Sequence, residues 1–182
     1  MRTCLIVLPL LALAACTASN ETSMGATRDA PPSSIMAVQL LGPNSELRGT
    51  ASLEARPAGL RITARVEGLA PGTYAIHYHQ VGICTPPTFD SAGPHFNPLM
   101  KQHGRENPMG PHVGDLPNIV VAANGKGEIT HTVDGLMLTG GANPLLDGDG
   151  AAVVLHAGAD DYRTDPSGNS GKRIACGTLA AR

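Results

Sequence analysis

Aromatic residues are scarce in this chain of 182 residues, at 3% of the sequence, and tryptophan is absent. Aliphatic and small β-branched side chains must therefore fill the core. Neither sign of charge dominates, because 13 basic and 15 acidic residues give a net charge of −2 with histidines neutral. That balance gives no indication of a nucleic-acid-binding surface. Long apolar runs at helical period and internal repeats are also missing, which leaves short strands as the elements to expect.

The N-terminal stretch MRTCLIVLPLLALAAC has a basic start, an apolar segment and small residues before Cys16. The apolar segment is too short for a membrane-spanning helix, so residues 1–15 are predicted to be a signal peptide. The last four residues resemble the lipoprotein box in which the cysteine is lipidated. The alternative is an ordinary secretory signal with an incidental Cys16. Residues 16–34 are small, polar and proline-bearing and are predicted to form a flexible tether, followed by one domain over 35–182.

Two cysteines remain once Cys4 leaves with the signal and Cys16 is lipidated, namely Cys84 and Cys176. An even pair outside the cytoplasm favours a disulfide. A bridge here would close a loop of about 90 residues and stabilise the fold by about 4–5 kcal/mol. The alternative is two buried free thiols.

Apolar and polar residues alternate in segments separated by turn signals, which is typical of half-buried antiparallel strands. The segment LRITARVEGL at 60–69 is the clearest example, and NGKG at 124–127 predicts a hairpin turn. Eight strands of this kind predict an all-β antiparallel barrel or sandwich. The predicted strands are 35–42, 48–55, 60–67, 73–80, 118–123, 128–133, 151–157 and 173–179.

Six of the seven histidines lie at predicted strand ends or in the long loop 81–117. His77 and His79 are two residues apart in a strand, so both project from one face, with Ile76 and Tyr78 directed to the core. His-x-His alone is weak evidence for a metal. The long loop strengthens the evidence for a metal site, because it supplies nitrogen and carboxylate groups that suit a closed zinc site. These groups are His95, His103, His112 and Asp115.

His156 ends an apolar strand, and Asp160 and Asp161 follow it in a second polar loop, 157–172. A lone histidine there could be an ordinary strand-end residue. Yet the chain has too many imidazoles for one zinc site, and an all-histidine set suits a redox-active copper. A nearby carboxylate is the expected partner of ligand histidines. His131 is expected to be a surface strand residue without a metal role.

The segments HYHQVGIC, SAGPHFNP, HVGDLPN, VVLHAGADD and GNSGKRIACG, in this order, resemble the signature segments of the Cu/Zn superoxide dismutases. The resemblance runs from about residue 35 to the end. The five-residue step from His79 to Cys84 resembles the bacterial extracytoplasmic branch.

The resemblance implies an eight-stranded Greek-key β-barrel with a long metal-binding loop, and copper and zinc as cofactors. It implies catalytic roles for Arg173, which would dock the anionic substrate, and for His95, which would bridge the two metals. Asp160 would link His77 to His103, and Cys84 would pair with Cys176. The implied copper ligands are His77, His79, His95 and His156, and the implied zinc ligands are His95, His103, His112 and Asp115.

The implied reaction is dismutation of superoxide to oxygen and hydrogen peroxide. One alternative is a non-enzymatic copper/zinc-binding lipoprotein, a buffer or chaperone on the same fold; another is a β-domain with only a zinc staple. The implied location is the periplasm or cell envelope, with a membrane contact through the lipid on Cys16. The resemblance leaves two oligomeric states open, a monomer and a homodimer.

Overall fold

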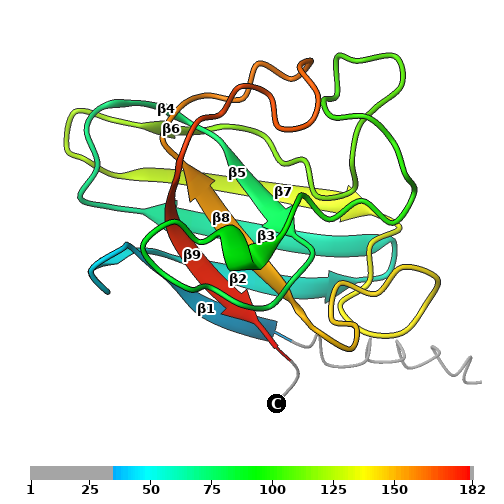
Figure 1. Ribbon diagram of the computed structural model, residues 1–182. Coiled ribbons are helices and arrows are strands. Elements are labelled where there is room, and N and C mark those ends of the chain that lie inside the picture. The colour runs from blue at the N-terminus through cyan, green and yellow to red at the C-terminus, as the bar shows by residue number, and fades with distance from the viewer. Residues whose placement is uncertain (1–34, 181–182) are drawn as a thin grey trace, which may run out of the picture. The chain divides into compact units, whose positions relative to one another are not determined.

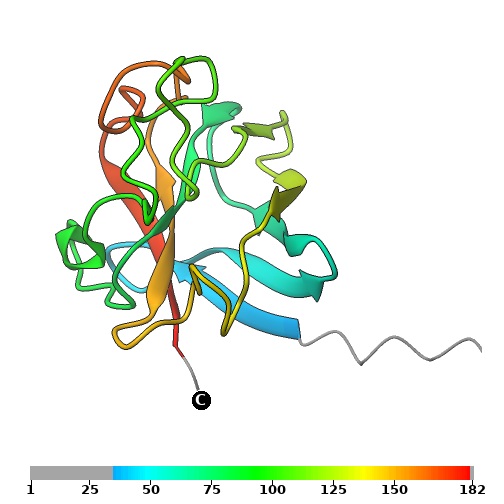
Figure 2. The same cartoon turned by 90° about the vertical axis from the view of Figure 1, so that its right-hand side faces the viewer.

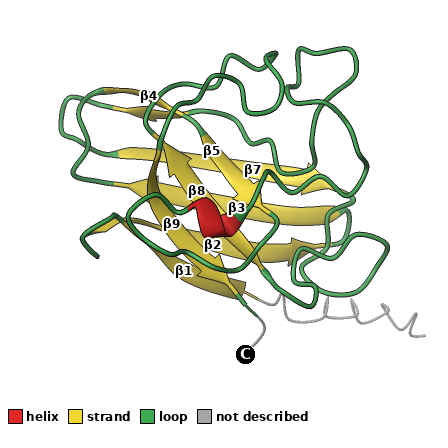
Figure 3. Cartoon of the chain, viewed as in Figure 1, coloured by secondary structure: helices red, strands yellow, loops and turns green. Residues whose placement is uncertain are grey.

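The computed structural model describes residues 35–180. The predicted signal peptide 1–15, Cys16 and the rest of the predicted tether lie outside these residues. The described chain is almost entirely strands and loops, with one three-residue 3-10 helix, η1, at Asp90–Ala92 (Figure 3). The strands are β1 Ile35–Leu41, β2 Leu47–Arg56, β3 Gly59–Val66, β4 Gly72–Tyr74, β5 Ile76–His79, β6 Ile119–Val121, β7 Gly127–Asp134, β8 Ala151–His156 and β9 Arg173–Leu179.

All strands belong to one antiparallel sheet in the order β4-β6-β7-β3-β2-β1-β9-β8-β5 (Figure 1). The two strands at the ends of this order, β4 and β5, are consecutive in the chain, so the sheet curls into a nearly closed barrel. Neighbours such as β3 and β7, or β1 and β9, are far apart in sequence, as in Greek-key arrangements. The predicted all-β barrel is confirmed.

Residues 35–180 form nine strands instead of the predicted eight, because the segment 73–80 is divided at Ala75. Tyr74 pairs with Ile119 of β6, whereas Ile76 pairs with Leu155 of β8. Ala75 itself donates to the carbonyl of Gly158 and accepts from His156 N. The chain therefore changes partners at this residue, which a period-2 pattern cannot show.

Strand β8 is buried on both faces, which explains why its sequence AAVVLH does not alternate. Val153 and Leu155 face the main core inside the barrel. Val154 faces a second, smaller cluster outside the barrel, where it meets Phe89 and Cys176. β8 is thus the wall between the core and the loop that covers it.

Of the two long connections, the second lies at one end of the barrel beside part of the first, whose other part, with η1, runs along the outside of β8 and β9 (Figures 1 and 2). The first loop, residues 80–118, joins β5 to β6, and the second loop, residues 157–172, joins β8 to β9. Among the described residues, no helix is long and apolar enough to cross a membrane.

Candidate metal centre

The site begins on β5, where alternate side chains point to opposite faces. Ile76 and Tyr78 pack in the barrel core, as predicted. His77 and His79 lie on the other face and are nevertheless buried, at 0% and 1% exposure. β5 pairs with β8, and this brings His79 Nε2 to 3.4 Å from Nε2 of His156. A local His-x-His pair therefore becomes a group of three imidazoles through strand pairing.

The first loop completes the site by returning to the free edge of β5. Tyr78 N donates to Gly114 O at 2.9 Å, and Phe96 N donates to Tyr78 O at 2.8 Å. Gly114 must be glycine, because a Cβ there would stand 2.5 Å from the Tyr78 carbonyl oxygen. The pairing sets His95 opposite His79 and Asp115 opposite His77.

Three groups of potential ligands result, each with its ligand atoms within 4.8 Å of one another. Every imidazole in them is buried, and His95 belongs to two groups. The groups are His77–His79–His95–His156, His95–His103–His112–Asp115 and His77–His103–Asp160. His131 lies in β7, outside all three of the groups found among the described residues.

Hydrogen bonds fix which ring nitrogen of each histidine in the first group remains free. His79 Nδ1 donates to the Gly93 carbonyl at 2.8 Å, so Nε2 keeps its lone pair. His77 Nε2 faces Asp160 Oδ2 at 3.0 Å, which leaves Nδ1 without a partner. His95 Nε2 is likewise buried without a partner. Unpaired buried nitrogens are costly, and a metal ion would satisfy them.

The second group converges on one oxygen atom. Asp115 Oδ1 lies 2.9, 3.0 and 3.2 Å from the Nδ1 atoms of His95, His103 and His112. The Nδ1 atoms of His103 and His112 have no hydrogen-bond partner despite this proximity. Ligands about 2.0 Å from a tetrahedral zinc are about 3.3 Å apart, so the donor set fits that ion closely.

Burial keeps the imidazoles of the first group neutral. It lowers the pKa of His79 to about 2, that of His156 to about 3 and that of His95 to about 4, from a usual 6.5. At neutral pH these rings therefore offer lone pairs instead of positive charge, as metal ligands must.

The second group, unlike the first, contains a negative charge, that of the Asp115 carboxylate. Burial would raise the pKa of Asp115, but its close histidine neighbours, His103, His112 and His95, hold the pKa well below its usual range. Burial also opposes protonation of His103, yet Asp115 and Asp160 raise its pKa to about 9 in the absence of a metal. This cluster therefore attracts positive charge, which a divalent cation can supply in place of a proton.

Asp160 connects the two groups. Its carboxylate accepts from His77 Nε2 at 3.0 Å through Oδ2 and from His103 Nε2 at 2.9 Å through Oδ1. Burial would raise its pKa, but these hydrogen bonds hold the pKa below its usual range. Each ring is thereby oriented with its other nitrogen directed to the metal groups.

Arg173, the first residue of β9, is held beside the first group. Its guanidinium donates to the carbonyls of Phe89 and Gly93, each at 2.6 Å. Gly93 O also accepts from His79, so one carbonyl orients both the cation and a histidine of the group. Partial burial lowers the pKa of Arg173, and the side chain lines a cavity of about 540 Å³ together with Lys172 and Asp90.

The Cys84–Cys176 disulfide ties the first loop to β9, across 92 residues of sequence. The predicted pairing is confirmed. Cys176 packs beside Phe89 and Val154, so the bridge fastens the segment that carries the carbonyls contacting Arg173.

Three groups that orient the histidines of the site were not predicted, because no motif in the sequence marks them. The Gly93 carbonyl is a backbone group. Ser170 is fully buried, and its hydroxyl lies 3.1 Å from His156 Nδ1. Asp165, an exposed residue, accepts from His103 N at 2.6 Å.

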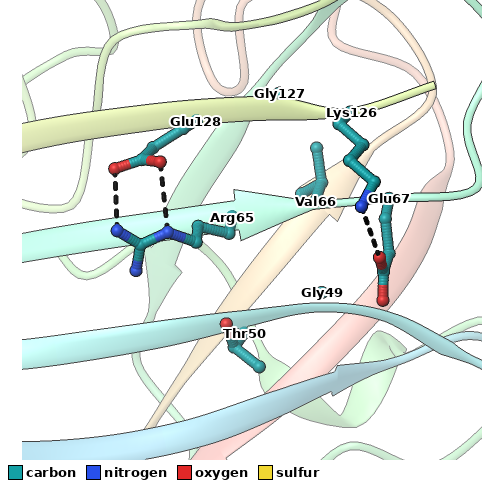
Figure 4. A pocket seen from close by; sticks show the side chains of 8 residues that line it. All are labelled: Gly49, Thr50, Arg65, Val66, Glu67, Lys126, Gly127 and Glu128. Atoms are coloured by element: carbon teal, nitrogen blue, oxygen red, sulfur yellow. Dashed lines mark hydrogen bonds and ion pairs between the residues drawn. The ribbon is translucent and has the colours of Figure 1, made fainter. Parts of the chain in front are cut away.

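Another cavity, of about 390 Å³, lies over β2, β3 and β7 (Figure 4). Its charged side chains are paired with one another, Arg65 with Glu128 and Lys126 with Glu67. It contains no residue of the three metal groups, so we assign it no catalytic role.

The family model for copper/zinc superoxide dismutase (SODC) matches residues 47–179. Superoxide dismutase (Cu-Zn) 2 of Aquifex aeolicus is 44% identical over 145 residues, covering 78% of this chain and 84% of its own length. Superoxide dismutase (Cu-Zn) of Deinococcus radiodurans is 35% identical, with 97% of each chain covered.

Among solved structures, a SOD-like protein from Bacillus subtilis superposes with a TM-score of 0.76 at 41% identity, covering 80% of this chain and 99% of that one. The reaction is dismutation of superoxide to oxygen and hydrogen peroxide, with copper and zinc as cofactors. It is supported by the family match, by these relatives and by the two histidine groups. The chain belongs to the copper/zinc superoxide dismutase family.

Proposed function

We propose that the two groups of ligands divide the metals between them, with His95 shared. Copper is held by His77 Nδ1 and by the Nε2 atoms of His79, His95 and His156. Zinc is held by Asp115 Oδ1 and by the Nδ1 atoms of His95, His103 and His112. The observation that carries this assignment is the set of buried, unpaired ring nitrogens on four of these histidines, His77, His95, His103 and His112.

The chemistry differs between the two positions. A copper ion in the all-histidine group supplies the one-electron redox chemistry of the two half-reactions. The carboxylate in the other group suits zinc, which has no redox chemistry of its own. Asp115 adds the negative charge that partly balances a divalent cation.

The protein's own residues bring the substrate and its protons together. Arg173 docks the superoxide anion beside the copper ligands, since its guanidinium is fixed by two carbonyls and cannot swing away. His95 Nε2 would hold a proton in the half of the cycle in which it does not bind copper, and would donate this proton to the product peroxide in the other half. While it holds this proton, His95 would be a neutral imidazole bound through Nδ1, and its Nε2 proton would be made more acidic by the cation on the other nitrogen.

The alternatives raised by the sequence are less well supported. A zinc-staple domain leaves the group His77, His79 and His156 without a purpose. A metal buffer does not require a fixed cation such as Arg173 beside the copper ligands. The family relatives also favour the enzyme.

The assignment is tested by metal content and superoxide decay in purified, metal-loaded protein. His156→Ala should lose copper and activity but keep zinc, because His156 belongs to only one group. His131→Ala is the matched control and should keep both metals and full activity. Copper retained at full occupancy in His156→Ala would contradict the assignment.

We also propose that the mature chain begins at a lipidated Cys16 and is tethered to a membrane of the bacterial cell envelope through residues 16–34. The signal-like N-terminus supports this, and the disulfide is consistent with an extracytoplasmic location. Mass spectrometry of the mature N-terminus is the test. A chain that begins elsewhere with an unmodified Cys16 would contradict the proposal.

A further inference from the structure

Tyr162 in the second loop has an unusual backbone. Its φ is +61°, in the left-handed region that side chains other than glycine rarely adopt. Such a conformation costs about 1–2 kcal/mol and persists only where surrounding contacts enforce it. Tyr162 has such contacts on its backbone and on its side chain, and they involve three separate segments.

The first set of contacts joins Tyr162 to the first loop. The Arg105 guanidinium carbon lies 3.8 Å from the centre of the tyrosine ring, in cation–π geometry. Glu106 N donates to the Tyr162 carbonyl at 3.0 Å. Gly104 permits this approach, because a Cβ there would stand 2.1 Å from that same carbonyl oxygen.

The second set of contacts leads to Asn118, the last residue before β6. The Tyr162 hydroxyl accepts from Asn118 N at 2.8 Å. The Asn118 side chain in turn makes two hydrogen bonds with the backbone of Asp160, each 2.9 Å long. Tyr162 thus fixes the residue that clamps the Asp160 main chain.

The third contact reaches the Asp160 carboxylate itself. Tyr162 N donates to Asp160 Oδ1 at 2.6 Å, beside the bond that this oxygen accepts from His103 Nε2. The other oxygen, Oδ2, accepts from His77 Nε2. Tyr162, the residue with the left-handed backbone, is therefore also the residue whose N–H donates to the Asp160 carboxylate.

We propose that Tyr162 is a positioning residue that, with Arg105 and Asn118, holds the Asp160 carboxylate in register with His77 and His103. Tyr162 touches neither metal nor substrate in this arrangement; it controls how firmly the two histidines are oriented, and hence how slowly zinc is released. The inference rests on the metal assignment above, since it requires His103 to be a zinc ligand.

The expected magnitude follows from the distance of Tyr162 from the metals. Removing a direct partner of ligand histidines typically weakens metal affinity by about 10–100-fold. Asp160→Asn should fall in that range. Tyr162→Ala acts one contact further out, so we expect zinc to leave about 10 times faster. Both variants keep the backbone N–H; Tyr162→Phe also keeps the ring, loses only the hydroxyl, and should have a smaller effect, about 3-fold.

The experiment measures zinc release to a chromophoric chelator from fully metallated protein, together with the copper electron paramagnetic resonance spectrum. Tyr74→Phe is the matched control: its hydroxyl donates to the carbonyl of Ala70, an exposed residue before β4, and the variant should release zinc like wild type. Circular dichroism and thermal unfolding of the metallated proteins identify any variant that fails to fold; Tyr162→Phe, which retains the ring, then serves in place of Tyr162→Ala.

The double variant Tyr162→Ala/Asp160→Asn gives the decisive result. If Tyr162 acts through Asp160, this variant should release zinc no faster than Asp160→Asn alone. Multiplied effects would show an independent, merely structural role and overturn the inference. Wild-type release from both Tyr162 variants would overturn it as well.

Asp115→Ala separates these outcomes from failure of the metal assignment. Loss of zinc from Asp115→Ala, together with wild-type release from the Tyr162 variants, overturns only the role of Tyr162. Zinc retained by Asp115→Ala would overturn the zinc assignment and this inference with it.

Discussion

Replacing Arg173 with isoleucine removes a fixed positive charge from beside the proposed copper ligands. The guanidinium is held by two carbonyls, those of Phe89 and Gly93. None of the atoms lost in Arg173→Ile belongs to a ligand group. We therefore expect copper and zinc contents near those of the wild type, and a specific loss of activity with superoxide.

The magnitude follows from the charge and its exposure. A superoxide anion docked about 4–6 Å from the guanidinium gains about 3–4 kcal/mol at an effective dielectric constant of about 20. Arg173 is only partly buried, so water and salt reduce this gain, to about 1.4–2.8 kcal/mol. That energy corresponds to a rate lower by about one to two orders of magnitude.

The assay is superoxide decay followed by pulse radiolysis at several ionic strengths. The wild-type rate should fall as salt is added, and the Arg173→Ile rate should fall less. Arg65→Ile is a matched control that removes one positive charge from an exposed ion pair with Glu128, outside the ligand groups. It should retain nearly full activity. Full activity in metallated Arg173→Ile would refute the docking role.

Three further predictions concern the metals, the disulfide and pH. Asp115→Ala should lose zinc and expose the first loop to proteolysis; unchanged zinc content and digestion would contradict the zinc assignment. Cys84→Ser should lower the free energy of unfolding in denaturant by up to about 4–5 kcal/mol, since the bridge spans 92 residues; an unchanged midpoint and slope would show that the bridge does not stabilise the fold. After chelation of the metals, the free energy of unfolding should fall as pH drops below about 6.5. Three buried histidines stay neutral in the folded protein but bind protons when it is unfolded, and each lowers the free energy of unfolding by about 1.4 kcal/mol per pH unit. The pKa of His103 is raised to about 9, so its protonation stabilises the fold fully below pH 6.5 and this contribution is lost only as pH rises from 6.5 to 9. It therefore does not affect the trend below pH 6.5. Denaturant unfolding of the metal-free protein at pH 7, 6 and 5 measures the trend, and a stability independent of pH would contradict it. The three histidines are His79, His95 and His156.

Much of the fold was predictable because it depends on local sequence patterns. Alternation of apolar and polar residues locates most strands, and the hairpin turn at 124–127 joins β6 to β7 as expected. The ligand residues could also be recognised, because imidazole and carboxylate groups concentrated in a loop with few apolar residues are typical of a metal site. The sequence further separates the faces of β5, with Tyr78 in the core and His77 outside it.

What only the tertiary structure decided depends on contacts between distant residues. The change of partner at Ala75 arises because β6 and β8 present their edges to successive parts of one segment. The convergence of three Nδ1 atoms on Asp115 Oδ1 requires the first loop to fold back along β5. Backbone hydrogen bonds hold it there, and these cannot be predicted from side-chain patterns. The clamp around Asp160 joins segments more than 40 residues apart. Local periodicity fixes which way a side chain points from its strand, but the positions of metal-ligand atoms to within a few tenths of an ångström depend on long-range pairing.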